Sequence, residues 1–203
     1  YCDYLRDIGS RVTLIPQSRQ EGFGHAVYCA REWVDNQPFL LMLGDHLYVS
    51  ENGESCTAQL LRAYRENREQ SVLGLYEADL EDVSHYGTVN GTWKINGERT
   101  LQLTELAEKP SEDYAVHHLV PAGMPENKFL CVFGMYVLTP AIFRHLERDI
   151  AADARERGEI QLTTALESLR RSEGMYGHLI AGKHYDTGLP DAYVHTLKSL
   201  HHS

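Results

Sequence analysis

Two aspartates stand where a metal ion could be bound. Asp45 follows the apolar run 39–43, and Asp186 lies between a second predicted strand and a predicted helix. Carboxylates at two strand ends can share one Mg²⁺, which prefers oxygen ligands and usually keeps waters and phosphates in its shell. The alternative is that each aspartate stabilises a turn or caps a helix, as Asp often does. Spacing alone leaves both interpretations open.

A glycine-containing loop is the second candidate site. Residues 17–27 carry Gly22 and Gly24 just before a predicted helix. Glycine lets a backbone approach a flat ligand closely because it has no Cβ. This loop therefore predicts a site for a planar group. His25, at the start of the helix, could face that ligand or could equally be a cap or a surface residue.

A third candidate is the pair Glu108-Lys109, which follows the predicted strand 101–107 and precedes Pro110. A glutamate at a strand end can accept hydrogen bonds from sugar hydroxyls, and a lysine can bind a phosphate as a point charge. The alternative is a solvated ion pair before a proline turn.

Composition excludes several classes of function. The chain has 203 residues and a net charge of −10, which argues against general binding of nucleic acid. No apolar run approaches the roughly 20 residues that span a membrane, and residues 1–7 lack the pattern of a signal peptide. The four cysteines form no CxxC or Cys/His cluster, so we expect reduced thiols, no zinc site and a cytoplasmic location.

The elements that must position these residues alternate along the chain. Strands are predicted at 11–15, 39–43, 71–76, 101–107, 128–138 and 175–180, and helices at 24–34, 55–67, 141–146, 161–171 and 192–200. Asn90-Gly91 is typical of a hairpin turn, with residues 93–95 as the returning strand. Alternating strands and helices predict one α/β domain over residues 1–203, with a mixed, mainly parallel sheet and antiparallel excursions near 87–107.

Seven short motifs, in order, resemble the bacterial sugar-phosphate nucleotidyltransferases. They are QSRQEGFGHAVYCA at 17–30, LGD at 43–45, YGTV at 86–89, AEKP at 107–110, FGMYVL at 133–138, GEIQLT at 158–163 and YDTG at 185–188. Each motif is weak alone, but their common order is specific. The GHAV and EIQLT forms favour the uridylyl-transferring branch, and the fold implied is a Rossmann-like nucleotidyltransferase domain.

The resemblance implies which residues bind substrates. Gln17 and Gly22 would contact the uracil base of UTP. Gly87 and Glu108 would bind the glucose hydroxyls of glucose 1-phosphate, and Gly134 would close the sugar pocket.

The resemblance also implies the chemistry. The catalytic residues would be Lys109, which binds the sugar phosphate, and Asp45; Asp45 and Asp186 would hold Mg²⁺. An oxygen of glucose 1-phosphate would attack the α-phosphorus of UTP, giving UDP-glucose and pyrophosphate. UTP and glucose 1-phosphate are the expected partners, with no nucleic acid and no membrane, and the protein would form a homo-oligomer.

The chain departs from the family pattern at three places. The glycine-rich phosphate loop and a lysine that belong to the family's N-terminal region do not occur here, so the domain is expected to be N-terminally incomplete. Thr164 stands where the uridylyl enzymes usually have Asp, and LPDA at 189–192 replaces a polar, Gly-containing turn. Two alternatives stay open: a nucleotidyltransferase for another sugar phosphate, and a non-catalytic homologue that binds a sugar nucleotide.

Overall fold

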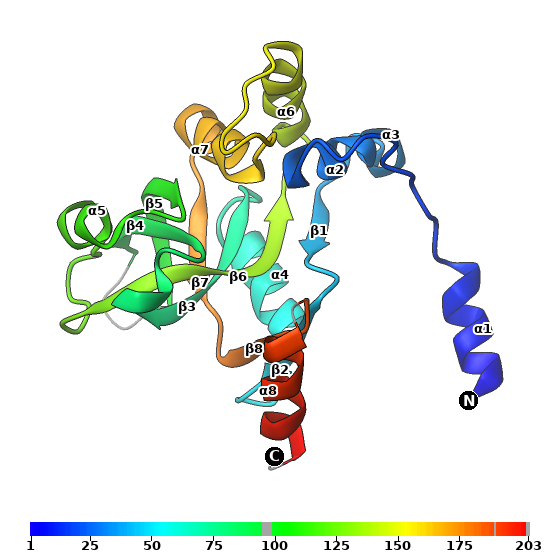
Figure 1. Ribbon diagram of the computed structural model, residues 1–203, viewed down its shortest axis with the longest axis horizontal. Coiled ribbons are helices and arrows are strands. Elements are labelled where there is room, and N and C mark those ends of the chain that lie inside the picture. The colour runs from blue at the N-terminus through cyan, green and yellow to red at the C-terminus, as the bar shows by residue number, and fades with distance from the viewer. Residues whose placement is uncertain (95–98, 189, 202–203) are drawn as a thin grey trace.

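The fold is a central sheet with helices on both faces, seen in a computed structural model that describes residues 1–94, 99–188 and 190–201 (Figure 1). The strands are β1 Phe39–Met42, β2 His46–Ser50, β3 Val72–Asp79, β4 Gly87–Trp93, β5 Thr100–Glu108, β6 Lys128–Leu138, β7 Tyr176–Leu179 and β8 Gly182–Asp186. The helices are α1 Cys2–Ser10, α2 Phe23–Cys29, α3 Arg31–Val34, α4 Cys56–Glu66, α5 Glu112–His118, α6 Ile142–Ala151, α7 Leu162–Glu173 and α8 Pro190–His201, with a 3₁₀ turn at Leu80–Asp82.

The core lies on both faces of β6, the longest strand. Leu130 and Leu138 point to a cluster that includes α6 and α7, whereas Phe133 and Met135 point to a cluster under α4. All four side chains are fully buried. A strand covered on both faces is expected to be apolar throughout rather than alternating, which explains the continuous apolar sequence of β6.

The large sheet is mixed, as expected, but it is not mainly parallel. Its order is β1-β6-β3-β7-β5-β4, and β2 and β8 form a separate two-stranded sheet. Of the pairings in the described part of the large sheet, only β3 with β7 is parallel. The helical crossover between β1 and β3 does give these two strands the same direction, but β6 inserts between them and runs the opposite way. The alternation of strands and helices along the sequence indicates crossover connections, but it does not indicate that another strand inserts between the two strands so connected.

Two local predictions were wrong. Residues 11–15 form no strand in the described structure, because no neighbouring strand pairs with them, and Leu14 is 88% exposed. Asn90-Gly91 is not a hairpin turn but a register shift inside β4. A Cβ on Gly91 would lie 2.5 Å from the carbonyl oxygen of Gln102, so the glycine there allows a close approach of two strands.

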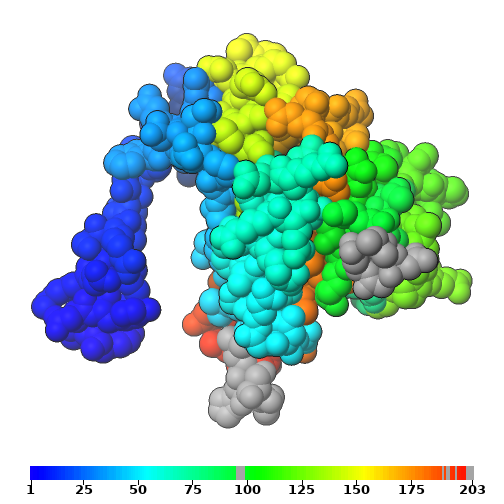
Figure 2. Space-filling model, turned by 180° about the vertical axis from the view of Figure 1, so that it is seen from behind, coloured from blue at the N-terminus to red at the C-terminus, as the bar shows by residue number. Residues whose placement is uncertain are grey.

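Helix α1 stands away from the body of the molecule, and none of its residues is buried (Figures 1 and 2). Apolar side chains are also exposed on β1 and β2: Leu40, Met42, Leu47 and Val49 are each 36–46% exposed. Within the described residues, no helix is long and apolar enough to cross a membrane.

Candidate functional site

Four of the predicted site residues line one cavity of about 230 Å³. Gly87 begins β4, Glu108 ends β5, Lys109 follows it, and Gly134 lies in the middle of β6. The full lining is Phe23, Leu43, His46, His85, Tyr86, Gly87, Glu108, Lys109, Val132, Gly134, Tyr136, Gln161, Leu162 and Thr163. Antiparallel pairing sets Gly87 opposite Glu108, which brings residues 21 positions apart in the sequence to the same wall.

The end of β5 presents an acid and a base with different surroundings. Glu108 is half-buried, and its Oε2 accepts a hydrogen bond of 2.5 Å from Thr163 Oγ1 at the start of α7. Lys109 is exposed and has a left-handed backbone with φ of 43°. Its amide donates to the carbonyl oxygen of Tyr86 at 3.2 Å. Glu108 can thus accept hydrogen bonds from ligand hydroxyls, while Lys109 supplies positive charge at the exposed edge of the cavity.

Gly134 joins β6 to the segment that carries Asp45. Its carbonyl oxygen accepts hydrogen bonds from Tyr48 Oη at 2.7 Å and from the Leu43 amide at 3.1 Å. Its φ is +84°, and a Cβ there would lie 2.8 Å from His46 Nδ1 and 3.0 Å from Tyr48 Oη. Only glycine fits this position without displacing its neighbours.

The two predicted metal ligands converge. Strand β2 pairs with β8 so that His46 faces Asp186, and both the amide and the hydroxyl of Thr187 donate to the Asp45 carbonyl oxygen at 2.7 Å. A Cβ on Gly188 would lie 2.6 Å from Asp45 Oδ2 and 3.2 Å from Asp186 Oδ1. The two carboxylates therefore face one small space.

The donor set of this space fits Mg²⁺. Within the described residues, no group of three or more His, Cys, Asp or Glu side chains could hold a metal ion. A site with two carboxylates leaves most of the coordination shell to waters and phosphate oxygens, which is the usual arrangement for Mg²⁺ at a nucleotide. Asp186 Oδ1 also accepts a hydrogen bond of 2.7 Å from the Gly188 amide, which fixes its orientation.

His46 connects the carboxylates to the cavity, and sequence reasoning missed it. It follows Asp45 directly, and its ring stacks on that of His184 with centroids 5.2 Å apart. Burial, followed by the charge of His46, lowers the pKa of His184 to about 4, so His184 is neutral near pH 7. The only signal in the sequence was the position of His46 next to Asp45.

The loop with Gln17 and Gly22 lies beside this cavity rather than in its wall. The Gln17 amide nitrogen donates to the Gly22 carbonyl oxygen at 3.1 Å and lies 3.0 Å from His25 Nδ1. His25 Nε2 is 3.3 Å from a Glu21 carboxylate oxygen. Phe23, next to Gly22, lines the cavity. The contact of Gln17 and Gly22 with a base stays a prediction.

The glycines of this loop have a packing role that the sequence did not indicate. Gly22 has φ of +110°, and a Cβ on it would lie 2.7 Å from the carbonyl oxygen of Ile160. A Cβ on Gly24 would lie 2.8 Å from the same oxygen, which accepts the Gly24 amide at 2.9 Å. Close contact with the segment before α7 therefore explains both glycines.

Comparison with known proteins gives consistent matches. The sequence profile of the nucleotidyl transferase family matches residues 2–203. A UTP–glucose-1-phosphate uridylyltransferase 2 of Staphylococcus saprophyticus is 34% identical over 187 residues, which is 92% of this chain and 58% of that protein. A Bacillus subtilis protein named as a putative enzyme of the same kind is 32% identical over 91% of this chain and 61% of its own length.

Solved structures agree. A UDP-glucose pyrophosphorylase crystallised with UDP-glucose matches with a TM-score of 0.81 and 27% identity, over 98% of this chain and 70% of that one. An apo UDP-glucose pyrophosphorylase matches with a TM-score of 0.80 and 28% identity, over 97% and 67%. The chain thus spans about three fifths of the length of the curated relatives that it matches.

Proposed function

Because the chain belongs to the nucleotidyl transferase family, we propose that its protein transfers UMP from UTP to glucose 1-phosphate. The observation that carries this proposal is the convergence of Gly87, Glu108, Lys109 and Gly134 on one cavity. His46 in the wall of that cavity adjoins Asp45 in sequence and Asp186 across the strand pair. This arrangement supports a sugar site beside a pair of carboxylates.

Each group has a defined task in this reaction. Glu108 accepts hydrogen bonds from glucose hydroxyls, and the Thr163 hydroxyl donates a hydrogen bond to the same carboxylate. Lys109 pairs with the phosphate of glucose 1-phosphate and orients it. One phosphate oxygen then attacks the α-phosphorus of UTP; the new P–O bond forms as the bond to the β-phosphate oxygen breaks, and pyrophosphate leaves. Such transfer depends on positioning and charge neutralisation, with no covalent intermediate on the protein.

We propose that Asp45 and Asp186 hold the Mg²⁺ and that Gln17 reads the base. Mg²⁺ bound there would neutralise phosphate charge during transfer. Gln17 offers both a donor and an acceptor, which suits the edge of uracil. The cysteines are unpaired, which supports a cytoplasmic location, and a homo-oligomer stays a prediction.

Lys109 provides the sharpest test of the proposed function. In the full-length protein, Lys109→Ala should lower the rate of UDP-glucose formation by about 10²–10⁴-fold, because a charge-assisted contact and its positioning are lost together. Lys109→Arg should rescue poorly, since a planar fork does not replace a point charge. Near-normal turnover of Lys109→Ala would refute the assignment.

The specific alternative to be tested is that the substrate is a sugar phosphate other than glucose 1-phosphate. Thr164 stands where related enzymes usually have Asp, and its hydroxyl donates to Glu156 at 3.2 Å. The wild-type protein should therefore be assayed with UTP against glucose, galactose and N-acetylglucosamine 1-phosphates. A higher kcat/KM for galactose or N-acetylglucosamine 1-phosphate would replace glucose 1-phosphate as the substrate, and no turnover with any of the three would favour a non-catalytic homologue that binds a sugar nucleotide.

A further inference from the structure

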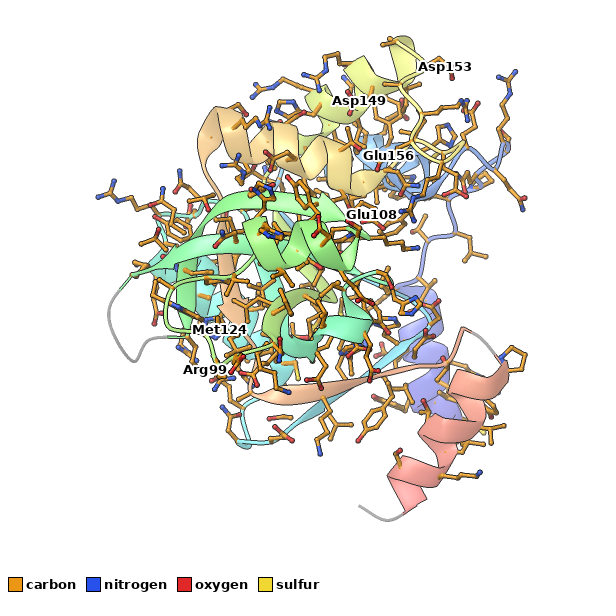
Figure 3. All side chains as sticks on the ribbon, turned by 60° about the vertical axis from the view of Figure 1, so that its left-hand side comes forward. Arg99, Glu108, Met124, Asp149, Asp153 and Glu156 are labelled. Carbon is orange, nitrogen blue, oxygen red and sulfur yellow. The ribbon has the colours of Figure 1, made fainter. Side chains whose placement is uncertain are left out.

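A second cavity lies at the end of the sheet away from Glu108. This distal cavity includes in its lining Arg62, Lys94, Arg99, Thr100 and His178. Its volume of about 420 Å³ is within the range of small-molecule sites. Strand β5 runs from Thr100 in its wall to Glu108 in the wall of the first cavity, a span of roughly 26 Å at about 3.3 Å per residue. Arg99 and Glu108 accordingly lie well apart in Figure 3, so the two cavities are separate places on the molecule.

The distal cavity is basic, although the chain as a whole carries a net charge of −10. Arg62, Lys94 and Arg99 bring three permanent positive charges to its wall, and Glu66 brings one negative charge. Arg62 is already paired with Glu54 at 3.0 Å and more loosely with Glu66 at 3.8 Å. The excess positive charge therefore comes from Lys94 and Arg99, neither of which forms an ion pair with another described residue.

Both of these side chains are fixed by single hydrogen bonds to neutral groups. Arg99 Nε donates to the Leu179 carbonyl oxygen at 2.6 Å, and the Leu179 amide donates back to the Arg99 carbonyl oxygen at 2.7 Å. Lys94 Nζ donates to Oδ1 of Asn67, whose side chain is only 2% exposed, at 2.8 Å. Most N–H donors of the guanidinium and the ammonium thus remain available in a fixed geometry.

His178 contributes a buried ring nitrogen to the same wall. The residue is 5% exposed, and its Nδ1 lies 2.8 Å from Thr100 Oγ1, whereas Nε2 has no hydrogen-bond partner in the described part of the chain. Burial, followed by the positive charges of Arg62 and Arg99, lowers the pKa of His178 to about 4, so the ring is neutral near pH 7. With Nδ1 accepting from the Thr100 hydroxyl, the neutral ring carries its proton on Nε2 and can donate it to a ligand oxygen.

From these contacts we propose that the distal cavity binds the phosphate group of a small molecule between Lys94, Arg99 and His178. A phosphate dianion offers several acceptor oxygens, which suits donors that come from different sides, and a guanidinium fork matches its geometry. A carboxylate has one charge and two oxygens, so it satisfies fewer of these donors. The site does not depend on the proposed function, because it lies away from the residues assigned to the transfer reaction.

Isothermal titration calorimetry on the full-length protein tests the proposal. The protein should carry Lys109→Ala and be kept free of Mg²⁺, which removes the phosphate contact proposed for the first cavity. Inorganic phosphate and glycerol 2-phosphate are the probes, and acetate is the carboxylate for comparison. We expect at least one of the phosphates to bind at one site per chain, with an affinity at least about 10-fold higher than that of acetate.

The two phosphates distinguish the sources of the ligand. Tighter binding of glycerol 2-phosphate would identify an esterified phosphate, and equal or tighter binding of inorganic phosphate would identify the free anion; both results support the proposal. Failure of both to bind, or equal binding of acetate, would overturn it. The readout is binding rather than turnover, so the result stands whether or not the protein transfers UMP.

Two variants link the binding to the distal cavity. Lys94→Gln and Arg99→Gln should each lower the affinity for phosphate by about 10-fold or more, because a charge-assisted contact is lost. Both side chains are exposed, so the melting temperatures without phosphate should stay close to that of the parent protein. Arg6→Gln is the matched control: it removes the same charge from α1, where Arg6 pairs with Asp3, and should change the affinity less than twofold. Unchanged affinity in both cavity variants, or an equal loss in Arg6→Gln, would overturn the inference.

Discussion

Replacing Gly134 by alanine should both destabilise the protein and damage the cavity. The added Cβ would stand 2.8 Å from His46 Nδ1, 3.0 Å from Leu43 Cδ1 and 3.0 Å from Tyr48 Oη. Real Cβ atoms essentially never come as close to another atom as the 2.8 Å to His46 Nδ1, so at least one neighbour must move. Because His46 lines the cavity, its displacement should also weaken binding of the sugar phosphate.

The expected loss of stability has two parts. A left-handed backbone costs alanine about 1–2 kcal/mol relative to glycine, and crowding a packed site costs typically about 1–3 kcal/mol. The free energy of unfolding should therefore fall by roughly 2–5 kcal/mol. At about 2–4 °C per kcal/mol for a chain of this size, the melting temperature should fall by roughly 4–20 °C.

Gly123→Ala is the control that isolates crowding. Gly123 has φ of +85°, and a Cβ on it would meet nothing within 4 Å. This variant carries the left-handed cost and the same loss of unfolded-state entropy, but no crowding. Urea unfolding should therefore separate the two variants by about 1–3 kcal/mol. Equal stabilities would refute the claim that Gly134 is needed for the close approach of β6 to His46 and Tyr48.

Three further predictions concern other parts of the site and the core. Asp45→Asn and Asp186→Asn should each raise the Mg²⁺ concentration for half-maximal activity by at least about 10-fold; an unchanged Mg²⁺ titration would show that these carboxylates do not bind the ion. Gln17→Ala should weaken UTP use by about 1–3 kcal/mol through unpaired groups at the base edge, and an unchanged preference for UTP over CTP would show that the base is read elsewhere. Burial, followed by the charges of Arg62 and Arg99 and partly opposed by Glu54, lowers the pKa of His178 from 6.5 to about 4. The unfolded state therefore binds more protons in that range, so stability should fall by about 3 kcal/mol as the pH drops from 6.5 to 4, and this fall should be smaller in His178→Gln when urea midpoints are compared.

The sequence alone was sufficient for the family and for much of the local structure. The ordered motifs indicated a nucleotidyltransferase, which the family profile and the relatives confirm. The helix predicted at 161–171 is α7, and its buried residues Leu162, Ala165, Leu166 and Leu169 recur at helical spacing. Such features depend on residues close in the chain, whose periodicity is set by the backbone geometry of one element.

The directions of the strands and the contacts around the candidate site could be determined only from the tertiary structure. The insertion of β6 between β1 and β3, the pairing of β2 with β8, and the bulge at Asn90-Gly91 all depend on which strand meets which. The same holds for His46 beside Gly134 and for Thr163 against Glu108. These partners are separated by 55 to 88 positions, and no local pattern records them, because side-chain packing selects among many pairings that the same periodicities permit.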